Sequence, residues 1–240
     1  MKREYIKWFS SNLQREMELL IFGHAGSPVL LFPTRMGRFY DYENWGVIKA
    51  LEEKIVSGKN QLYCLDSIDA ESFYCKSIPP TDRIYRYTLF EKYLLEEVIP
   101  FIKQQNKNEL ISAGCSLGAY HAVNIAFRHP HLFKKTIGIS GRYDLTIQVK
   151  HFDNLFEGYL DDTVYSNMPA LYIPNFSSKE KISLQNLDII LVVGKEDLFV
   201  KNNLQLSESL RKKNIPHQLH LVEGEAHKAI YWGALLNTYL

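Results

Sequence analysis

Short apolar runs alternate with longer segments of helical periodicity along most of this chain. Together with two β-like segments near the start, these runs predict strands at residues 4–9, 17–22, 29–32, 61–65, 110–113, 136–139, 188–193 and 217–222. The helical periodicity predicts helices at residues 43–56, 81–103, 117–127, 198–212 and 227–239. Because helices between strands act as crossovers, this order predicts an α/β fold whose sheet is mostly parallel and covered by helices on both faces. The first two strands should form an antiparallel pair at one edge of the sheet.

The chain contains no segment with the composition of an interdomain linker. Its 240 residues and 46% hydrophobic content are enough for one substantial core, so we expect a single domain spanning residues 1–240. Residues 142–187 are rich in aromatic side chains but lack sustained periodicity. We expect them to form an irregular insertion of short helices and loops.

The charge balance and the apolar pattern argue against several kinds of protein. Lys and Arg total 28 against 27 for Asp and Glu, and the net charge of +1 gives no electrostatic basis for binding nucleic acid. The amino-terminal segment lacks the apolar core of a secretory signal, and no apolar run is long enough to cross a membrane. We therefore expect a cytoplasmic protein.

The three cysteines of the chain argue against two kinds of site. Cys64, Cys75 and Cys115 are odd in number and lack CxxC spacing, which argues against a disulfide framework and a zinc site.

One short motif carries a specific chemical expectation. Gly114-Cys115-Ser116-Leu117-Gly118 matches Gly-x-Ser-x-Gly and lies where a predicted strand meets a predicted helix. A serine on such a sharp turn is held in a strained conformation at the carboxyl end of the sheet, beside the free N–H groups of a helix start. Ser116 is therefore the candidate nucleophile. Cys115 is a weaker rival, because a cysteine at the end of a buried strand more often packs as a small apolar residue.

A serine hydroxyl needs a base to accept its proton, and His227 fits that role best. It follows the last predicted strand through a turn and precedes the final helix, so it can reach back over the motif. The other histidines lie inside predicted helices or strands, beside a proline, or in other loop segments: His24, His121, His129, His131, His151, His217 and His220. None has metal-ligand spacing, so no metal is expected.

A carboxylate is needed to orient the imidazole of the base and to stabilise its protonated form. Asp197 follows the strand at residues 188–193 and lies one element before His227, which makes it the leading candidate. Asp144, after the preceding strand, and Glu196 are the alternatives. A solvated turn carboxylate or a helix cap is the simpler explanation for any of the three.

The negative charge that develops on a substrate oxygen requires two N–H donors. The N–H of Leu117, directly after the nucleophile, should supply one of them. The loop at residues 33–38 should supply the other through the backbone of Arg35 or Met36, and the sequence leaves that choice open.

Taken together, these features resemble those of the esterase D and enterochelin-esterase branch of the α/β-hydrolases, which includes small bacterial esterases and mycolyltransferases. The resemblance implies the α/β-hydrolase fold and esterase or acyl-transfer chemistry without a cofactor. Arg35 and Met36 are bulkier than the residues that relatives often have there, and Lys228 stands where a carboxylate or amide is common. The resemblance rests on Phe32-Pro33-Thr34 leading into Tyr40-Asp41-Tyr42-Glu43, Gly114 to Tyr120 with His129-Pro130, Gly141-Arg142-Tyr143-Asp144-Leu145, Asp161-Asp162 to Pro174-Asn175, and His227 followed by Tyr231-Trp232.

The expected function is hydrolysis of small-molecule carboxylic esters by a Ser116, His227 and Asp197 triad through an acyl-enzyme. The insertion at residues 142–187 should cover this site. Acyl transfer or thioester hydrolysis by the same triad is an alternative, as is a catalytically silent binding protein with this fold. No nucleic-acid or membrane partner is expected, and the sequence leaves open whether the chain forms a homo-oligomer.

Overall fold

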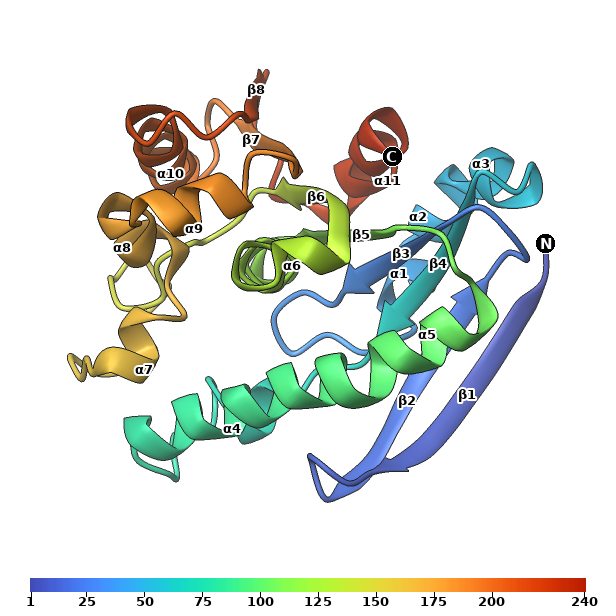
Figure 1. Ribbon diagram of the computed structural model, residues 1–240, viewed down its shortest axis with the longest axis horizontal. Coiled ribbons are helices and arrows are strands. Elements are labelled where there is room, and N and C mark those ends of the chain that lie inside the picture. Colours follow the sequence, from blue (N-terminus) through green and yellow to red (C-terminus); the bar gives the residue numbers. More distant parts are fainter.

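An eight-stranded sheet organises the computed structural model, which describes residues 1–240 (Figure 1). The strands lie in the order β1-β2-β4-β3-β5-β6-β7-β8. β1 and β2 pair antiparallel, β2 joins β4 antiparallel, and every later pair is parallel. The predicted mostly parallel sheet with two leading antiparallel edge strands is therefore confirmed. The bounds are β1 Arg3–Ser10, β2 Arg15–Phe22, β3 Ser27–Phe32, β4 Asn60–Leu65, β5 Leu110–Cys115, β6 Phe133–Ile139, β7 Asp188–Gly194 and β8 Gln218–Val222.

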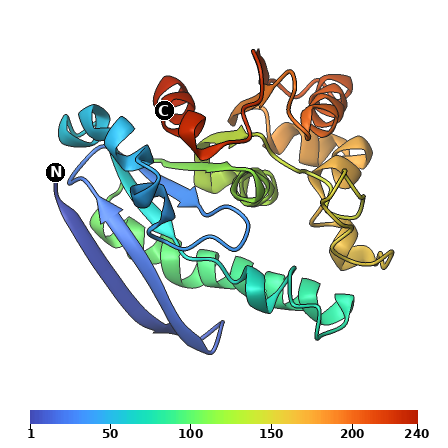
Figure 2. The same cartoon turned by 180° about the vertical axis from the view of Figure 1, so that it is seen from behind.

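Helices cover both faces of the sheet, as Figures 1 and 2 show from opposite sides. The helical elements are α1 Asp41–Asn44, α2 Val47–Ala50, α3 Glu52–Val56, η1 Asp69–Glu71, α4 Pro80–Tyr93, η2 Leu94–Val98, α5 Ile99–Gln105, α6 Leu117–Arg128, η3 Pro130–Leu132, α7 Asp162–Tyr165, α8 Pro169–Tyr172, η4 Ile173–Asn175, α9 Ser178–Ser183, α10 Val200–Lys212 and α11 Ala229–Tyr239. One core cluster includes buried side chains of α4, α5, α6, α8 and α10, and the other includes those of α2, α3 and α11. The two clusters lie on opposite faces because alternate residues of each buried strand point to opposite sides.

Two predicted helices are divided in the structure. The predicted helix at residues 43–56 becomes α1, α2 and α3. α1 and α2 are separated because Gly46 adopts a left-handed conformation with φ of 75° that no regular helix tolerates, and a second break lies at Leu51. The predicted helix at residues 81–103 contains the π-helical turn η2 before α5. Pro100 is the second residue of α5, and its missing N–H prevents a regular bond to the preceding turn.

The segment at residues 142–187 consists of loops with α7, α8, η4 and α9. α7 packs against α4, and α8 packs against α6 and α10, so this later part lies over one helical layer. The earlier loop around Phe152 lies beside His227 instead. No helix of the structure is both long enough and apolar enough to cross a membrane.

Candidate active site

Ser116 lies at the sharp turn between β5 and α6. Its backbone has φ of 57° and ψ of −122°, a combination that L-residues rarely adopt and that costs about 1–3 kcal/mol. The Ser116 N–H donates to the carbonyl of Ile139 at 2.8 Å, which ties the turn to the end of β6. The strain is thus maintained by the surrounding sheet, and the side chain is presented at the carboxyl end of the strands.

The two glycines of the motif allow the backbone segments at this turn to touch. A Cβ on Gly118 would lie 2.3 Å from the carbonyl oxygen of Phe32 and 2.7 Å from that of Pro33. A Cβ on Gly114 would lie 2.3 Å from the backbone of Gly118. Both contacts are far closer than real Cβ atoms permit, so only glycine lets the end of β3 lie against the start of α6.

A buried tyrosine hydroxyl joins the same two strand ends. Tyr42 donates a hydrogen bond to the carbonyl of Phe32 at 2.9 Å and accepts one from the Cys115 N–H at 3.1 Å. Burial raises the pKa of the Tyr42 hydroxyl well above its usual value, so it remains protonated and can make both bonds. It therefore holds the residue before the nucleophile in register with the loop that follows β3.

His227 lies within hydrogen-bonding distance of the nucleophile. The distance from Ser116 Oγ to His227 Nε2 is 3.0 Å, although the residues are 111 positions apart in the sequence. Aromatic rings surround the imidazole, with centroids 5.1 Å away for Phe199, 6.2 Å for Phe152 and 6.4 Å for Trp232. These rings shield the Ser116–His227 pair from solvent and limit the orientations of the imidazole.

Asp197 lies on the far side of the imidazole and is only 3% exposed. Its Oδ1 is 3.5 Å from His227 Nδ1 and accepts a 2.9 Å hydrogen bond from the Phe199 N–H. Burial alone would raise the pKa of Asp197, but its contacts with His227, the Phe199 N–H and Ser140 lower it below the usual value. Asp197 Oδ2 and His227 Nδ1 have no hydrogen-bond partner, so a small rotation would complete the contact.

Close backbone packing brings the loops of Asp197 and His227 together. A Cβ on Gly194 would lie 2.4 Å from the carbonyl oxygen of Gly224 and 2.5 Å from the Ala226 nitrogen. The Glu196 N–H also donates to the Gly224 carbonyl at 3.1 Å. The turn after β7 and the turn after β8 therefore form one unit.

The alternatives considered from the sequence lie outside this arrangement. Asp144 is buried, but its Oδ1 accepts hydrogen bonds from the Thr146 N–H and hydroxyl at 2.8 and 2.6 Å. Glu196 is exposed on the turn. Cys115 is fully buried, and burial raises the pKa of its thiol far above the usual value, which suppresses the reactive thiolate.

The N–H groups near Ser116 differ in how they are used. The Leu117 N–H opens α6, where no intrahelical acceptor exists. The Met36 N–H donates to Asp69 Oδ2 at 2.7 Å, whereas the Arg35 N–H has no acceptor in the protein. Of the two residues left open by the sequence, only Arg35 therefore has a free donor.

Asp69 is a residue that the sequence reasoning missed. It is 2% exposed, and its Oδ1 lies 3.6 Å from Nε2 of the buried His121. A carboxylate a few residues beyond the carboxyl end of β4 is the signal that could have drawn attention to it. Tyr42 was noted only within a segment of resemblance, and no local pattern reveals its bridging role.

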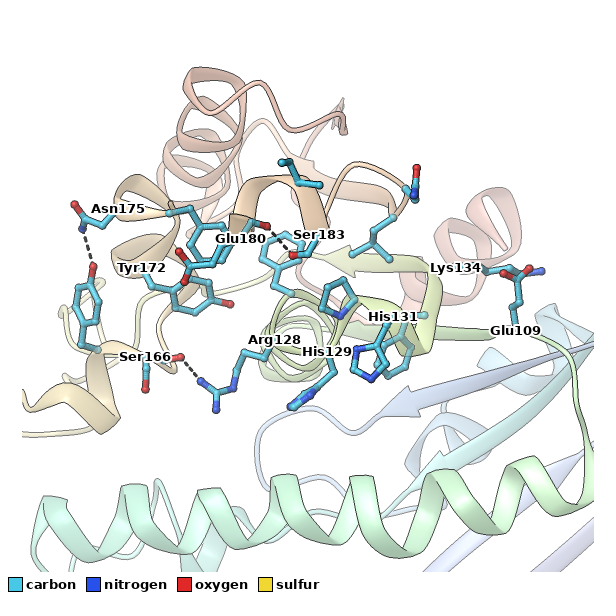
Figure 3. A pocket seen from close by; sticks show the side chains of 18 residues that line it. Glu109, Arg128, His129, His131, Lys134, Ser166, Tyr172, Asn175, Glu180 and Ser183 are labelled. Carbon is cyan, nitrogen blue, oxygen red and sulfur yellow. Dashed lines mark hydrogen bonds between the residues drawn. The ribbon is translucent and has the colours of Figure 1, made fainter. Parts of the chain in front are cut away.

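Two cavities lie on different sides of the molecule. One of about 390 Å³ includes Phe152, which contacts His227, and Arg35 of the loop after β3. A larger cavity of about 930 Å³ lies near the start of β6, where Arg128 and His129 line it (Figure 3). Because the amino ends of the strands face away from Ser116, this larger cavity is not part of the candidate site. No group of three or more metal-ligating side chains exists anywhere in the structure.

Comparisons with known proteins agree with this fold. The model of the prolyl oligopeptidase family matches residues 96–235. No match is found among curated proteins. A ferulic acid esterase structure superposes with a TM-score of 0.79 at 16% identity, covering 99% of this chain and 95% of that one.

Two further solved structures belong to the branch named in the sequence analysis. An S-formylglutathione hydrolase from Agrobacterium tumefaciens has a TM-score of 0.74 at 14% identity, covering 99% of this chain and 92% of that one. The enterobactin esterase from Shigella flexneri has a TM-score of 0.63 at 18% identity, covering 99% of this chain and 58% of that one. These similarities confirm the α/β-hydrolase fold and the expected resemblance. With the family match over more than half of its length, the chain belongs to the prolyl oligopeptidase family and is a serine hydrolase with the α/β-hydrolase fold.

Proposed function

We propose that this protein hydrolyses small-molecule carboxylic esters through an acyl-enzyme, with Ser116 as nucleophile, His227 as base and Asp197 as the orienting acid. The observation that carries the proposal is the 3.0 Å contact between Ser116 Oγ and His227 Nε2 at a strained strand-to-helix turn. A serine hydroxyl paired with an imidazole and placed beside free N–H donors is suited to acyl transfer.

Each step follows from the positions of these groups. His227 Nε2 accepts the Ser116 proton as Oγ attacks the carbonyl carbon of the ester. The N–H groups of Leu117 and Arg35 stabilise the negative oxygen that forms. The imidazolium then donates its proton to the leaving alcohol, and the acyl group remains on Ser116.

The second half of the reaction uses the same groups. Water attacks the acyl-enzyme while His227 accepts its proton, and the acid product leaves with the Ser116 hydroxyl restored. The pKa of Asp197 is lowered, so its carboxylate is ionised at neutral pH and stabilises the imidazolium in both halves. No cofactor has a role in this scheme.

Ser116, Asp197 and His227 all lie on turns that follow strands of one sheet. We therefore propose that residues 1–240 form a single catalytic domain. Only the loop around Phe152 from the segment 142–187 lies against the imidazole. The helices α7 to α9 pack elsewhere, so we assign the cover of the site to that loop.

The proposal predicts stoichiometric labelling of Ser116 by a fluorophosphonate and hydrolysis of p-nitrophenyl acetate. Ser116→Ala should abolish both, whereas Ser57→Ala, which alters an exposed serine remote from the triad, should retain both. Folding of each variant is checked by circular dichroism. Unchanged turnover in folded Ser116→Ala protein would refute the proposal.

Cleavage of thioesters and of peptides also has some support, and the same assay can separate these two activities from ester hydrolysis. The names of the neighbouring S-formylglutathione hydrolases imply a thioester substrate, and the family match is to a peptidase family. A thioester and a prolyl p-nitroanilide are therefore added to the ester panel. Faster cleavage of either compound than of the oxygen esters would reassign the substrate while keeping the triad.

A further inference from the structure

The cavity that Phe152 lines contains two guanidinium groups that form no ion pair with a carboxylate. It has a volume of about 390 Å³ and is lined by Arg35 and Arg142 together with Tyr74 and Phe152. The other two cations in its wall have their own partners. Arg83 Nη1 lies 2.8 Å from Glu157, and Lys76 Nζ lies 3.4 Å from Asp153.

Arg142 is the stronger of the two observations. Its side chain is 3% exposed, yet it forms no ion pair within the protein. Its Nη2 donates to the carbonyl oxygens of Ile147 and Asp153, while its Nε is buried without any partner. Burial lowers the pKa of Arg142, although the nearby carboxylates of Asp144 and Asp153 act in the opposite direction without forming an ion pair. A buried cation with an unused donor is normally matched by an anion.

Arg35 contributes a second, more exposed guanidinium to the same cavity. Its Cζ lies 5.3 Å from the ring centroid of Phe152 and 5.9 Å from that of Tyr74, so both rings hold its planar group. It too forms no salt bridge. The fork of N–H donors on each arginine suits the two oxygens of a carboxylate better than a point charge would.

Two residues of the cavity wall, Phe152 and Arg35, adjoin the candidate active site. The ring centroid of Phe152 is 6.2 Å from that of His227. Arg35 belongs to the loop whose free N–H we assign to the oxyanion. A group held by the two arginines would therefore belong to the molecule that is attacked by Ser116.

We propose that this cavity is a subsite for a carboxylate on the acyl part of the substrate, held by Arg142 and Arg35. The inference rests on the proposed ester hydrolysis and narrows its substrate class to esters of dicarboxylic acids. Arg142 binds the carboxylate through its free donors, and Arg35 closes over it from the solvent side. Binding of this group aligns the ester carbonyl with Ser116, so the preference appears in kcat/KM.

The first test compares mono-4-nitrophenyl esters of succinic, glutaric and adipic acid with their neutral methylated counterparts, after subtraction of spontaneous hydrolysis. We expect the best charged ester to be preferred by about tenfold or more in kcat/KM, as one charge-assisted contact would give. Arg142→Met should lower this preference about tenfold, and Arg142→Lys should keep part of it. Lys212→Met removes an exposed cation that does not line the cavity and should change the preference less than about twofold, because exposed charges are screened.

The second test requires no turnover and no variant. Free adipate should bind the wild-type protein in calorimetry and slow the labelling of Ser116, whereas adipamide at matched ionic strength should not. If the wild-type protein neither hydrolysed the esters nor reacted with the fluorophosphonate at Ser116, the proposed function would be refuted. Adipate binding would in that case still support the anion subsite. Equal turnover of charged and neutral esters, or absence of adipate binding, would overturn the inference and leave the triad intact.

Discussion

The backbone N–H of Met36 donates a 2.7 Å hydrogen bond to the buried carboxylate of Asp69, and this bond fixes the loop that follows β3. Met36 has a left-handed φ of 56°, so the loop is strained and needs such a restraint. The adjacent Arg35 N–H has no acceptor in the protein, and in the mechanism that we propose it binds the substrate oxygen. We therefore propose that Asp69 is a positioning residue for the reaction.

Replacing Asp69 with alanine should lower kcat about tenfold with a smaller change in KM, because a loosened donor stabilises the transition state less. Asp69→Asn retains an oxygen acceptor for the Met36 N–H and should recover part of the rate. Steady-state kinetics on p-nitrophenyl acetate measure both parameters. A rise in KM alone, with kcat unchanged, would contradict a role in the transition state.

Replacing Asp197 with asparagine should lower kcat by a factor on the order of 10³–10⁴, because the amide favours the imidazole tautomer that cannot accept the serine proton. Glu196→Gln is the matched control, since it removes an exposed carboxylate from the same turn, and it should behave as wild type. The rate of fluorophosphonate labelling gives a second measurement. Similar losses in the two variants would show that the turn, and not the acid, matters.

Gly118→Ala should destabilise the protein by about 2–3 kcal/mol and reduce kcat strongly. Its new Cβ would meet the carbonyl oxygens of Phe32 and Pro33, so the end of β3 must move away from α6. The same movement would displace the Arg35 N–H. Urea unfolding and kinetics on the folded fraction test the two effects. Full activity at wild-type stability would show that the loop after β3 can move without loss of unfolding free energy or of kcat.

Tyr42→Phe should cost about 1–3 kcal/mol of unfolding free energy, because the Cys115 N–H and the Phe32 carbonyl lose their shared partner in a buried site. The ring itself is preserved, so packing changes little. Urea denaturation measures the loss. Tyr63→Phe is a suitable control, since the hydroxyl of Tyr63 is buried without a partner and its removal should cost less.

Glu91 links α4 to the end of α6, because it accepts hydrogen bonds from Arg128 at 3.0 and 3.1 Å and contacts His129 Nε2 at 2.6 Å. Burial would raise the pKa of Glu91, but hydrogen bonds from His129 and Arg128 lower it below the usual value. A lowered folded-state pKa means that its contribution is fully present above the unfolded value near 4.3 and is lost as pH falls through the folded value.

Glu91→Gln should therefore reduce unfolding free energy by about 2–3 kcal/mol at pH 7 and by progressively less below pH ~4. Urea unfolding of both proteins from neutral to acidic pH gives the difference at each point. A difference that stays constant down to the most acidic conditions would contradict the assigned charge state.

The sequence alone determined the alternation of strands and helices, the mostly parallel sheet and the strand-to-helix position of Ser116. These features are local, because hydrophobic periodicity and glycine placement act over a few residues at a time. The order of loops along the chain also indicated His227 and Asp197, since the carboxyl ends of parallel strands meet at one edge. The breaks at Gly46 and at η2 were missed, because a helical pattern persists across them.

Only the tertiary structure decided which polar groups are already used and which remain free. Asp69 engages the Met36 N–H from 33 positions away, and Tyr42 reaches Cys115 across 73. Arg142 forms no ion pair, while Arg83 in the wall of the same cavity pairs with Glu157. Such pairings depend on packing between distant segments, and a buried group's charge and reactivity follow from the partners that packing supplies.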